Sequence, residues 1–174
     1  MKSTLVVAIA VGISTSFISC SNAQNNNQEI TGTVQSTTIS KEQAQKVLSA
    51  YLEVKEALVQ TNGETASSAA QKLVTALGDT KDELADKIRF DAEHIAETKD
   101  AGHQRDHFNT LSDNIYAMVK ATGANADNLY RQYCPMAMDN EGAYWLSAEK
   151  EVNNPYFGNK MLHCGSVKET IKGN

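Results

Sequence analysis

The chain has 174 residues, with 16 basic and 21 acidic side chains and a formal net charge of −5 at pH 7. Binding to the phosphates of nucleic acid requires clustered Lys and Arg, so this acidic balance argues against nucleic acid as a partner. About 135 residues follow the N-terminal tether described below, which is enough for one domain with its own hydrophobic core.

Residues 1–19 have the features of a bacterial lipoprotein signal peptide. Lys2 supplies a positive start, and Leu5–Ile18 is a mostly apolar stretch too short to span a bilayer as a stable helix. It leads into Phe17-Ile18-Ser19-Cys20, which resembles a lipobox with phenylalanine where leucine is usual. We expect cleavage before Cys20 and lipidation of that cysteine; the alternative is an ordinary secretory signal cleaved near Ala23. Loss of Lys2 would leave 15 basic and 21 acidic residues, a net charge of −6.

Residues 20–38 would then comprise the lipidated cysteine and a flexible tether. The stretch from Ser21 to Ser36 consists mainly of Asn, Gln, Ser and Thr, a composition typical of disordered chain. A flexible coil of that length spans roughly 20–25 Å on average. We expect it to act as a spacer between the lipid and the domain.

Residues 39–123 predict four amphipathic helices. The region contains no proline, and apolar residues recur with a period of 3.6 that glycines interrupt. Capping boxes are expected to open the first helix at Ser40 with Gln43 and the third at Thr80 with Glu83. Four such helices joined by short loops are typical of an antiparallel four-helix bundle, so the fold class is mainly α. The apolar stripes are Ala44, Val47, Leu48, Tyr51, Val54 and Leu58; Ala66, Ala69, Leu73 and Leu77; Leu84, Ile88, Ala92 and Ile95; and Phe108, Leu111, Ile115 and Val119.

The helical region also contains histidines that could bind a metal. His103 and His107 lie four residues apart, on one face of the fourth predicted helix, and His94 or Asp106 could supply a third ligand. The region lacks the Glu between two His that zincins use, and it lacks the repeated Glu-x-x-His of di-metal bundles. We therefore favour the interpretation that the two histidines are half-exposed surface residues.

No catalytic set stands out in the sequence. The serines lie in polar, capping or linker settings without a Gly-x-Ser-x-Gly elbow, and no glycine-rich phosphate loop is present. Cys134 and His163 could form a thiolate–imidazole pair, but no orienting Asn or Asp is evident. The absence of Cys-x-x-Cys-His excludes covalent haem. The sequence therefore indicates a protein that is not an enzyme.

Residues 124–174 predict a small C-terminal β-hairpin and loop module packed on the bundle. Leu129–Met136 and Ala143–Ser147 are rich in β-favouring residues and flank a turn cluster at residues 139–142. Pro135 should place the first of these strands at an edge or force it to end.

Sulfur-bearing side chains are concentrated in this module. Side chains alternate along a strand, so Cys134, Met136 and Met138 are expected to share one face. A thiol and two thioethers form a soft ligand set of the kind that selects Cu(I) over hard cations.

A returning segment from Lys160 to Cys164 carries further candidate ligands. If this segment is extended, Met161 and His163 face one side and Cys164 faces the other. A turn at His163-Cys164-Gly165 would be needed to bring Met161 and Cys164 together, and Gly165 makes such a turn feasible.

The same residues also fit a purely structural interpretation. Aromatic side chains would form a small core whose gaps are filled by methionines. Cys134 and Cys164 would form a disulfide that closes about 30 residues and contributes about 3–4 kcal/mol. On the residues alone, the disulfide and the metal site are both open. The aromatic residues are Tyr130, Tyr133, Tyr144, Trp145, Tyr156 and Phe157.

Several motifs of rare residues follow one another between Tyr51 and Val167. They are Gln104-Arg105 with Phe108 and Leu111-Ser112, Tyr133-Cys134-Pro135-Met136-Ala137, Trp145-Leu146-Ser147, Asn154-Pro155-Tyr156-Phe157-Gly158, and Met161 with Cys164-Gly165. Together they resemble a bacterial domain family of formally unknown function. That family is found alone on lipoproteins or appended to periplasmic adaptors of copper and heavy-metal RND efflux pumps.

The Cys-Pro-Met and the later Cys-Gly also resemble the short heavy-metal-binding motif of those adaptors. In that motif His-Pro follows the methionine, and Cys-x-x-Cys-Gly-Met stands near the end. Here Ala137-Met138 replaces the His-Pro, and Cys164-Gly165-Ser166 lacks both the second thiol and the trailing methionine.

The resemblance implies non-enzymatic binding of Cu(I) or another soft heavy metal, linked to metal efflux or resistance. It implies a lipid-anchored protein on the periplasmic side of a Gram-negative membrane, with an RND-type efflux adaptor or another envelope protein as its partner. The expected metal ligands are Cys134, Met136 and Met161, followed by Cys164, His163 and Met138.

The alternative function is a protein–protein interaction module of the cell envelope that binds no metal. A Cys134–Cys164 disulfide would staple this module, and exposed aromatics such as Tyr156 and Phe157 would contact the partner. The sulfur geometry separates the two functions. Cys134 and Cys164 sulfurs at bonding distance favour the staple, whereas sulfurs of Cys134, Met136 and Met161 that converge around an unfilled point favour the metal.

Overall fold

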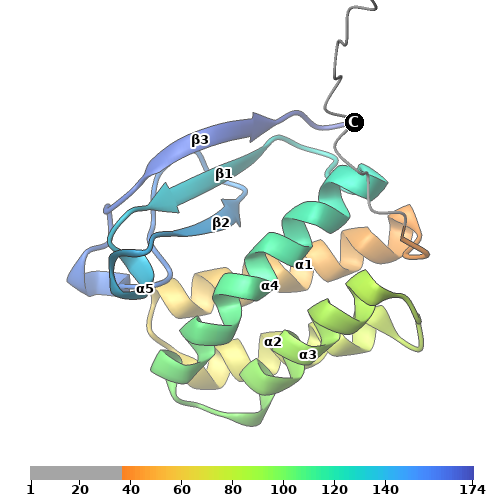
Figure 1. Cartoon of the computed structure of the whole chain (residues 1–174), viewed down its shortest axis with the longest axis horizontal. Coiled ribbons are helices and arrows are strands. Elements are labelled where there is room, and N and C mark those ends of the chain that lie inside the picture. Colours follow the sequence, from red (N-terminus) through yellow and green to blue (C-terminus); the bar gives the residue numbers. More distant parts are fainter. Residues whose placement is uncertain (1–36) are drawn as a thin grey trace, which may run out of the picture. The chain divides into compact units, whose positions relative to one another are not determined.

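The computed structural model describes residues 37–174, so the expected signal peptide, the lipidation of Cys20 and most of the tether lie outside the described residues. Four long helices, α1 Lys41–Val59, α2 Gly63–Leu77, α3 Glu83–Glu97 and α4 Ala101–Thr122, precede three strands (Figure 1). The strands are β1 Leu129–Cys134, β2 Ala143–Ser147 and β3 Ser166–Ile171, with two short helical turns, α5 Ala137–Asn140 and η1 Gly158–Lys160, between them. The described part is therefore mainly helical with a small sheet at its C-terminal end, as the sequence predicts.

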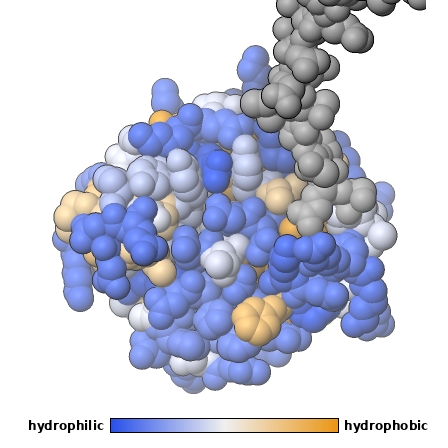
Figure 2. Space-filling model, in the orientation of Figure 1, coloured by the Kyte–Doolittle hydropathy of each residue, from blue (hydrophilic) through white to orange (hydrophobic). Residues whose placement is uncertain are grey.

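The surface of this part is largely polar. None of the helices within residues 37–174 is long and apolar enough to cross a bilayer. The face drawn in Figure 2 is mostly hydrophilic, with small and separate hydrophobic areas. Among the described residues, Phe90 and Met136 are the large hydrophobic side chains that are exposed, by 57% and 48%.

The helices pack against one another through the predicted apolar stripes. α1 contacts α2, α2 contacts α3, α3 contacts α4, and α1 also contacts α4. Every residue of the four predicted stripes is buried in one continuous core. The four helices and their buried faces are confirmed, while the up-and-down course of an antiparallel bundle stays a prediction.

The third helix begins two residues later than predicted. Its N-cap is Asp82, whose carboxylate accepts a hydrogen bond from Ala85 N at 2.8 Å. Thr80, the predicted cap, instead contacts the side-chain amide of Gln43 in α1 at 2.9 Å. An aspartate closer to the first apolar residue takes the capping position, and the threonine is left free to tie the α2–α3 connection to α1.

Asp82 also holds the segment before α1. Its other carboxylate oxygen accepts hydrogen bonds from Thr37 Oγ1 at 2.9 Å, Thr38 N at 2.7 Å and Thr38 Oγ1 at 2.8 Å. Burial, the largest single influence, raises the pKa of Asp82, but the hydrogen bonds together outweigh it and lower the pKa from 3.8 to about 2. The carboxylate form therefore stabilises the fold.

Acidification is expected to remove this stabilisation. The folded pKa of Asp82 lies below its unfolded value, so its contribution is complete above about pH 4 and is lost as the pH falls towards 2. Asp82→Ala should lower the free energy of unfolding at pH 7 by about 1–2 kcal/mol, and the deficit should shrink near pH 2. Urea denaturation between pH 2 and 7 measures both effects. The exposed Asp79→Ala is the control, and an equal deficit for Asp82→Ala at both pH values would contradict the assignment.

The sheet has the strand order β2-β1-β3, and both neighbouring pairs are antiparallel. The predicted hairpin is present, with Tyr133 opposite Tyr144 and Cys134 opposite Ala143. The strand β3 is not predicted from the sequence, because the residues of β3 alternate between exposed and half-buried without a strongly apolar face. Figure 1 shows the sheet beside α1 and α4, and β2 makes the contacts with both helices.

An aromatic row joins the sheet to the helices. Tyr51 of α1 stacks on Phe108 of α4 with ring centroids 5.2 Å apart, and Tyr156 lies 5.7 Å from Phe108 and 5.9 Å from Trp145 of β2. All four residues are buried. We name these four residues the aromatic row.

Tyr51, the member of the aromatic row that lies on α1, forms hydrogen bonds through its phenol OH both as acceptor and as donor. Tyr51 OH accepts a hydrogen bond from Leu146 N at 3.0 Å and lies 2.9 Å from Ser112 Oγ. Ser112 Oγ already donates to Phe108 O at 2.7 Å, so Tyr51 OH is the donor to Ser112. Burial raises the pKa of Tyr51 above its ordinary value, so the phenol stays protonated and keeps this donor role.

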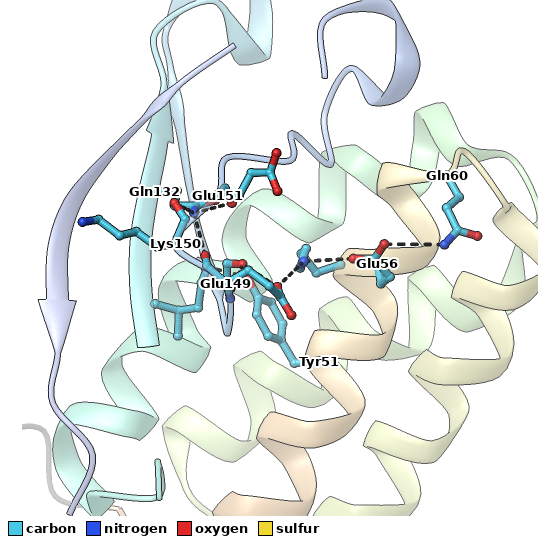
Figure 3. Close-up of polar contacts among 10 residues, drawn as sticks. Tyr51, Glu56, Gln60, Gln132, Glu149, Lys150 and Glu151 are labelled. Carbon is cyan, nitrogen blue, oxygen red and sulfur yellow. Dashed lines mark hydrogen bonds and ion pairs between the residues drawn. The ribbon is translucent and has the colours of Figure 1, made fainter. Parts of the chain in front are cut away.

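Buried polar side chains fasten the loop after β2 (Figure 3). Gln132 Nε2 donates to the carbonyl oxygens of Glu149, Lys150 and Glu151 at 3.0, 3.3 and 3.0 Å. Lys55 of α1 is 2% exposed, and its Nζ lies 3.4 Å from Glu149 Oε2. The loop is therefore tied both to β1 and to α1. These contacts fix the start of the segment that returns to Cys164.

Candidate functional site

The first candidate ligands lie where β1 ends. Pro135 has no backbone N–H to donate, and β1 stops at Cys134. Met136 lies in the turn that follows, and Met138 lies in α5 with a φ of 51°. The prediction that Cys134, Met136 and Met138 share one strand face is therefore wrong, because the strand does not continue past Cys134.

The α5 segment has an unusual backbone. Met138, Asp139 and Asn140 have positive φ values of 51°, 55° and 72°. For a residue with a Cβ this conformation costs about 1–2 kcal/mol, so neighbouring contacts must hold it. Glu141 N donates to Met138 O at 3.0 Å and closes this turn. The backbone that carries Met138 is thus held in a conformation it would not adopt alone.

Asn154 connects the Tyr156–Phe157 turn with the backbone of Cys164. Its Oδ1 accepts hydrogen bonds from Tyr156 N at 2.8 Å and Phe157 N at 3.2 Å, and its Nδ2 donates to Cys164 O at 2.7 Å. Its backbone N donates to Leu162 O at 2.7 Å. The buried Asn154 therefore fixes the Tyr156–Phe157 turn and the Cys164 backbone relative to each other.

Arg105 fastens this turn to the helices. Its Nε donates to Pro155 O at 2.7 Å, and its Nη2 donates to Leu58 O at 3.0 Å and Thr61 Oγ1 at 2.8 Å. Partial burial lowers the pKa of Arg105 from its ordinary value. The motifs Gln104-Arg105 and Asn154-Pro155 are thus joined through the hydrogen bond from Arg105 to Pro155.

The returning segment is not extended. Gly158–Lys160 is the short helical turn η1, and Cys164 N then donates to Met161 O at 3.0 Å. The expected alternation from Lys160 to Cys164 is wrong because the backbone turns twice here. A turn that brings Met161 and Cys164 near one another does exist, from Met161 to Cys164 rather than at residues 163–165. His163 is exposed at this turn, with Nδ1 2.9 Å from Val152 O.

Cys134 and Cys164 lie in contact. Their Sγ atoms are 2.8 Å apart, and both are free thiols. A disulfide bond is about 2.05 Å long, so a small approach of the two sulfurs suffices to form one. Cys134 is fully buried and Cys164 is half-buried. The hydrogen bond between the thiols, together with burial, raises the pKa of Cys164 above its ordinary value.

Three thioethers line one open hollow of about 500 Å³. Met136 and Met138 enter it from the turn after β1, and Met161 enters it from the turn before Cys164. We name it the thioether hollow. Its other lining residues are Gly102, Arg105, Asp106, Ala137, Asp139, Asn140, Tyr156 and Phe157.

The structure thus divides the predicted ligands into two groups. Met136, Met138 and Met161 share the thioether hollow, whereas Cys134 and Cys164 form a separate pair and are not among its lining residues. Cys134 therefore does not join Met136 and Met161 at the hollow, as the metal interpretation expected, because it packs on Cys164. His163 lies in neither group. Asp106, which the sequence offered as a third ligand beside His103 and His107, lines this hollow.

Tyr156 does not serve as a surface contact. It is 7% exposed, and its OH donates to Tyr144 O at 2.7 Å. Phe157 is half-buried in the thioether hollow. The expectation that both aromatics are exposed for a partner is therefore wrong for Tyr156, because the aromatic row buries it.

Among residues 37–174, no three His, Cys, Asp or Glu side chains are grouped as a set of metal ligands. Thioethers are a different class of ligand, and a methionine side chain binds soft metals without losing a proton. The three methionines of the hollow are therefore the residues that would suit a soft monovalent metal, whereas Asp106 and Asp139 in the same lining carry the oxygen ligands that hard cations prefer.

Comparison with known proteins bears on the helical part. Residues 47–127 match the model of a family described as "Protein of unknown function (DUF3347)". The chain is similar to a domain family of unknown function. The match begins within α1 and ends before β1, so the sulfur-rich module lies beyond it. No curated protein and no solved structure matches the chain.

Proposed function

We propose that this protein binds Cu(I), or a similar soft metal ion, in the thioether hollow and takes part in metal efflux or resistance without catalysing a reaction. The observation that carries the proposal is that Met136, Met138 and Met161 line one hollow. They are three of the five methionines in the chain, and a fourth, Met118, is buried in α4. Three thioethers give a soft, uncharged ligand set that suits Cu(I).

Exposure and backbone strain support the same assignment. Met136 is 48% exposed although it is a large apolar side chain, and Met138 has a left-handed backbone. Backbone strain is found most often at functional sites, where the surrounding structure holds it. A metal ion in the hollow would use both the accessible Met136 and the strained Met138.

The cysteine pair would extend this ligand set. Cys164 follows Met161 through one turn, and its backbone is anchored by Asn154. In the reduced protein its thiolate could join the thioethers, and Cys134 lies directly behind it. We place His163 outside the set, because it is exposed and bonded to Val152 O.

We further propose that the protein is lipid-anchored through Cys20 on the periplasmic side of a Gram-negative membrane and serves an RND-type efflux adaptor or another envelope protein. The lipobox-like stretch and the sequence motifs support this placement. On this proposal the tether gives the thioether hollow access to metal and to the partner.

Competition with a Cu(I) chelator under reducing conditions tests the metal proposal. The full chain should take up about one Cu(I), and Met136→Leu and Met161→Leu should each lower its affinity at least about tenfold, since each removes a ligand. Met118→Leu is the matched control and should leave the affinity unchanged, because Met118 is buried in the helical core. No competition by the reduced chain, or an equal loss with Met118→Leu, would contradict the proposal.

A second function is favoured by one observation, the 2.8 Å contact between Cys134 Sγ and Cys164 Sγ. If these thiols are permanently oxidised, the module is a stapled interaction surface that binds no metal. In that case the oxidised chain would still bind its envelope partner, and the methionine variants would bind it equally well.

A further inference from the structure

Three of the four histidines of the chain lie together on α3 and α4. His94 belongs to the last turn of α3, and its ring stacks on that of His107 with centroids 4.5 Å apart. His103 lies one turn before His107 on α4, with ring centroids 4.9 Å apart. We name these three residues the histidine cluster. It shares no residue with the thioether hollow.

Hydrogen bonds orient two of the three rings. His94 Nδ1 lies 2.8 Å from Phe90 O, and a carbonyl oxygen can only accept, so Nδ1 carries the proton. His107 Nδ1 lies 3.2 Å from Asp91 Oδ1, which makes it the donor to the carboxylate. In both neutral rings the lone pair is then on Nε2. Within residues 37–174 no hydrogen bond to Nε2 of any of the three histidines is present.

Asp91 holds the ring of His107 in this orientation. Its side chain is 6% exposed, and His107 is its hydrogen-bond partner among the described residues. A carboxylate behind the Nδ1–H of a histidine fixes the ring and makes Nε2 a better ligand, the arrangement found behind metal-binding histidines. Asp91 is therefore a positioning residue and not a ligand.

Phe90 covers the cluster from one side. Its ring lies 4.3 Å from that of His94 and 6.0 Å from that of His107, yet it is 57% exposed. Phe90 therefore packs beside two of the three rings.

We propose that the histidine cluster binds one borderline divalent metal ion, such as Ni²⁺, Cu²⁺ or Zn²⁺, through Nε2 of His94, His103 and His107. Imidazole nitrogen is the ligand these ions share. No set of three such ligands is formed among the described residues, so binding requires movement. His107 keeps the orientation that Asp91 gives it, whereas His103 and His94 turn about χ2, a soft torsion for histidine, and His94 gives up its hydrogen bond to Phe90 O. His103 is exposed and His94 half-buried, so both rings have room to turn.

Titration of the purified full chain with Ni²⁺ tests this proposal. Ni²⁺ is chosen because it does not undergo reduction by thiols and prefers imidazole to thioether. We expect one ion per chain, and His94→Gln and His103→Gln should each lower the affinity at least about tenfold, since each removes one of three ligands. In an NMR spectrum of the imidazole nitrogens, the three cluster residues should shift on binding and His163 should not.

His163→Gln is the matched control, because it removes the remaining histidine and leaves the cluster intact. Its affinity for Ni²⁺ should equal that of the unaltered chain, as should the affinity of Cys164→Ser. The proposal is overturned if no Ni²⁺ binds, if His94→Gln binds as tightly as the unaltered chain, or if His163→Gln weakens binding as much as His103→Gln does. Because Ni²⁺ and Cu(I) are read separately, failure here leaves the Cu(I) proposal standing, and the converse also holds.

Discussion

Replacing Phe108 with alanine is expected to lower the free energy of unfolding by about 3–5 kcal/mol, the range for removing a buried phenylalanine. Phe108 is fully buried and lies in the middle of the aromatic row, in contact with Tyr51 of α1 on one side and Tyr156 on the other. Its loss would leave a cavity where the helices meet the C-terminal module. Chemical denaturation followed by far-UV circular dichroism measures the effect.

The same substitution at Phe90 is the control. Phe90 is 57% exposed, so Phe90→Ala should change the free energy of unfolding by no more than about 0.5 kcal/mol. Phe108→Leu should fall between the two, since leucine fills part of the space. If Phe108→Ala and Phe90→Ala had similar effects, the aromatic row would not be the main joint between the two parts of the domain.

Oxidation of Cys134 and Cys164 to a disulfide is expected to raise the free energy of unfolding by about 3–4 kcal/mol, because the bond closes a loop of about 30 residues in the unfolded chain. Oxidised glutathione supplies the oxidising equivalents, as it accepts two electrons and two protons and leaves as two reduced molecules. The two Sγ atoms are already in contact at 2.8 Å, so little backbone movement is needed. Urea denaturation with and without a phosphine reductant measures the difference.

Cys164→Ser is the control for this experiment, because it leaves Cys134 without its neighbouring thiol and should make stability independent of the reductant. Cys164 is half-buried, so the serine variant should still fold. Oxidation should also lower the affinity for Cu(I), because it removes both thiols from the extended ligand set. Equal Cu(I) affinity of the oxidised and reduced chains would show that the thioethers act alone.

The parts of the fold that depend on local sequence were predictable. The helices follow from a 3.6-residue apolar period, and every residue of the four stripes is buried. The hairpin follows from β-favouring residues around a turn, and its register places Tyr133 opposite Tyr144. The β3 strand was not predictable, since Val167 and Ile171 are its only strongly apolar residues and it is held mainly by pairing with β1.

The candidate site was likewise predictable only in part. The sequence identifies which residues carry sulfur and imidazole, and it identifies Pro135 as the end of a strand. It does not reveal that Met138 has a left-handed backbone, since nothing in a methionine favours that conformation. Backbone hydrogen bonds from Glu141 N to Met138 O and from Gly142 N to Ala137 O close the turn that holds it.

By itself the sequence determined the class of this protein: an acidic chain with an expected lipoprotein signal, four amphipathic helices and a C-terminal module rich in sulfur and aromatic residues. Only the tertiary structure decided how that chemistry is divided. It set Cys134 against Cys164, gathered three methionines around one hollow, and stacked His94 on His107. The physical reason is that side-chain neighbours 13 to 95 residues apart are chosen by the packing of whole elements, such as Arg105 on Pro155 and Tyr51 on Leu146, which no local pattern encodes.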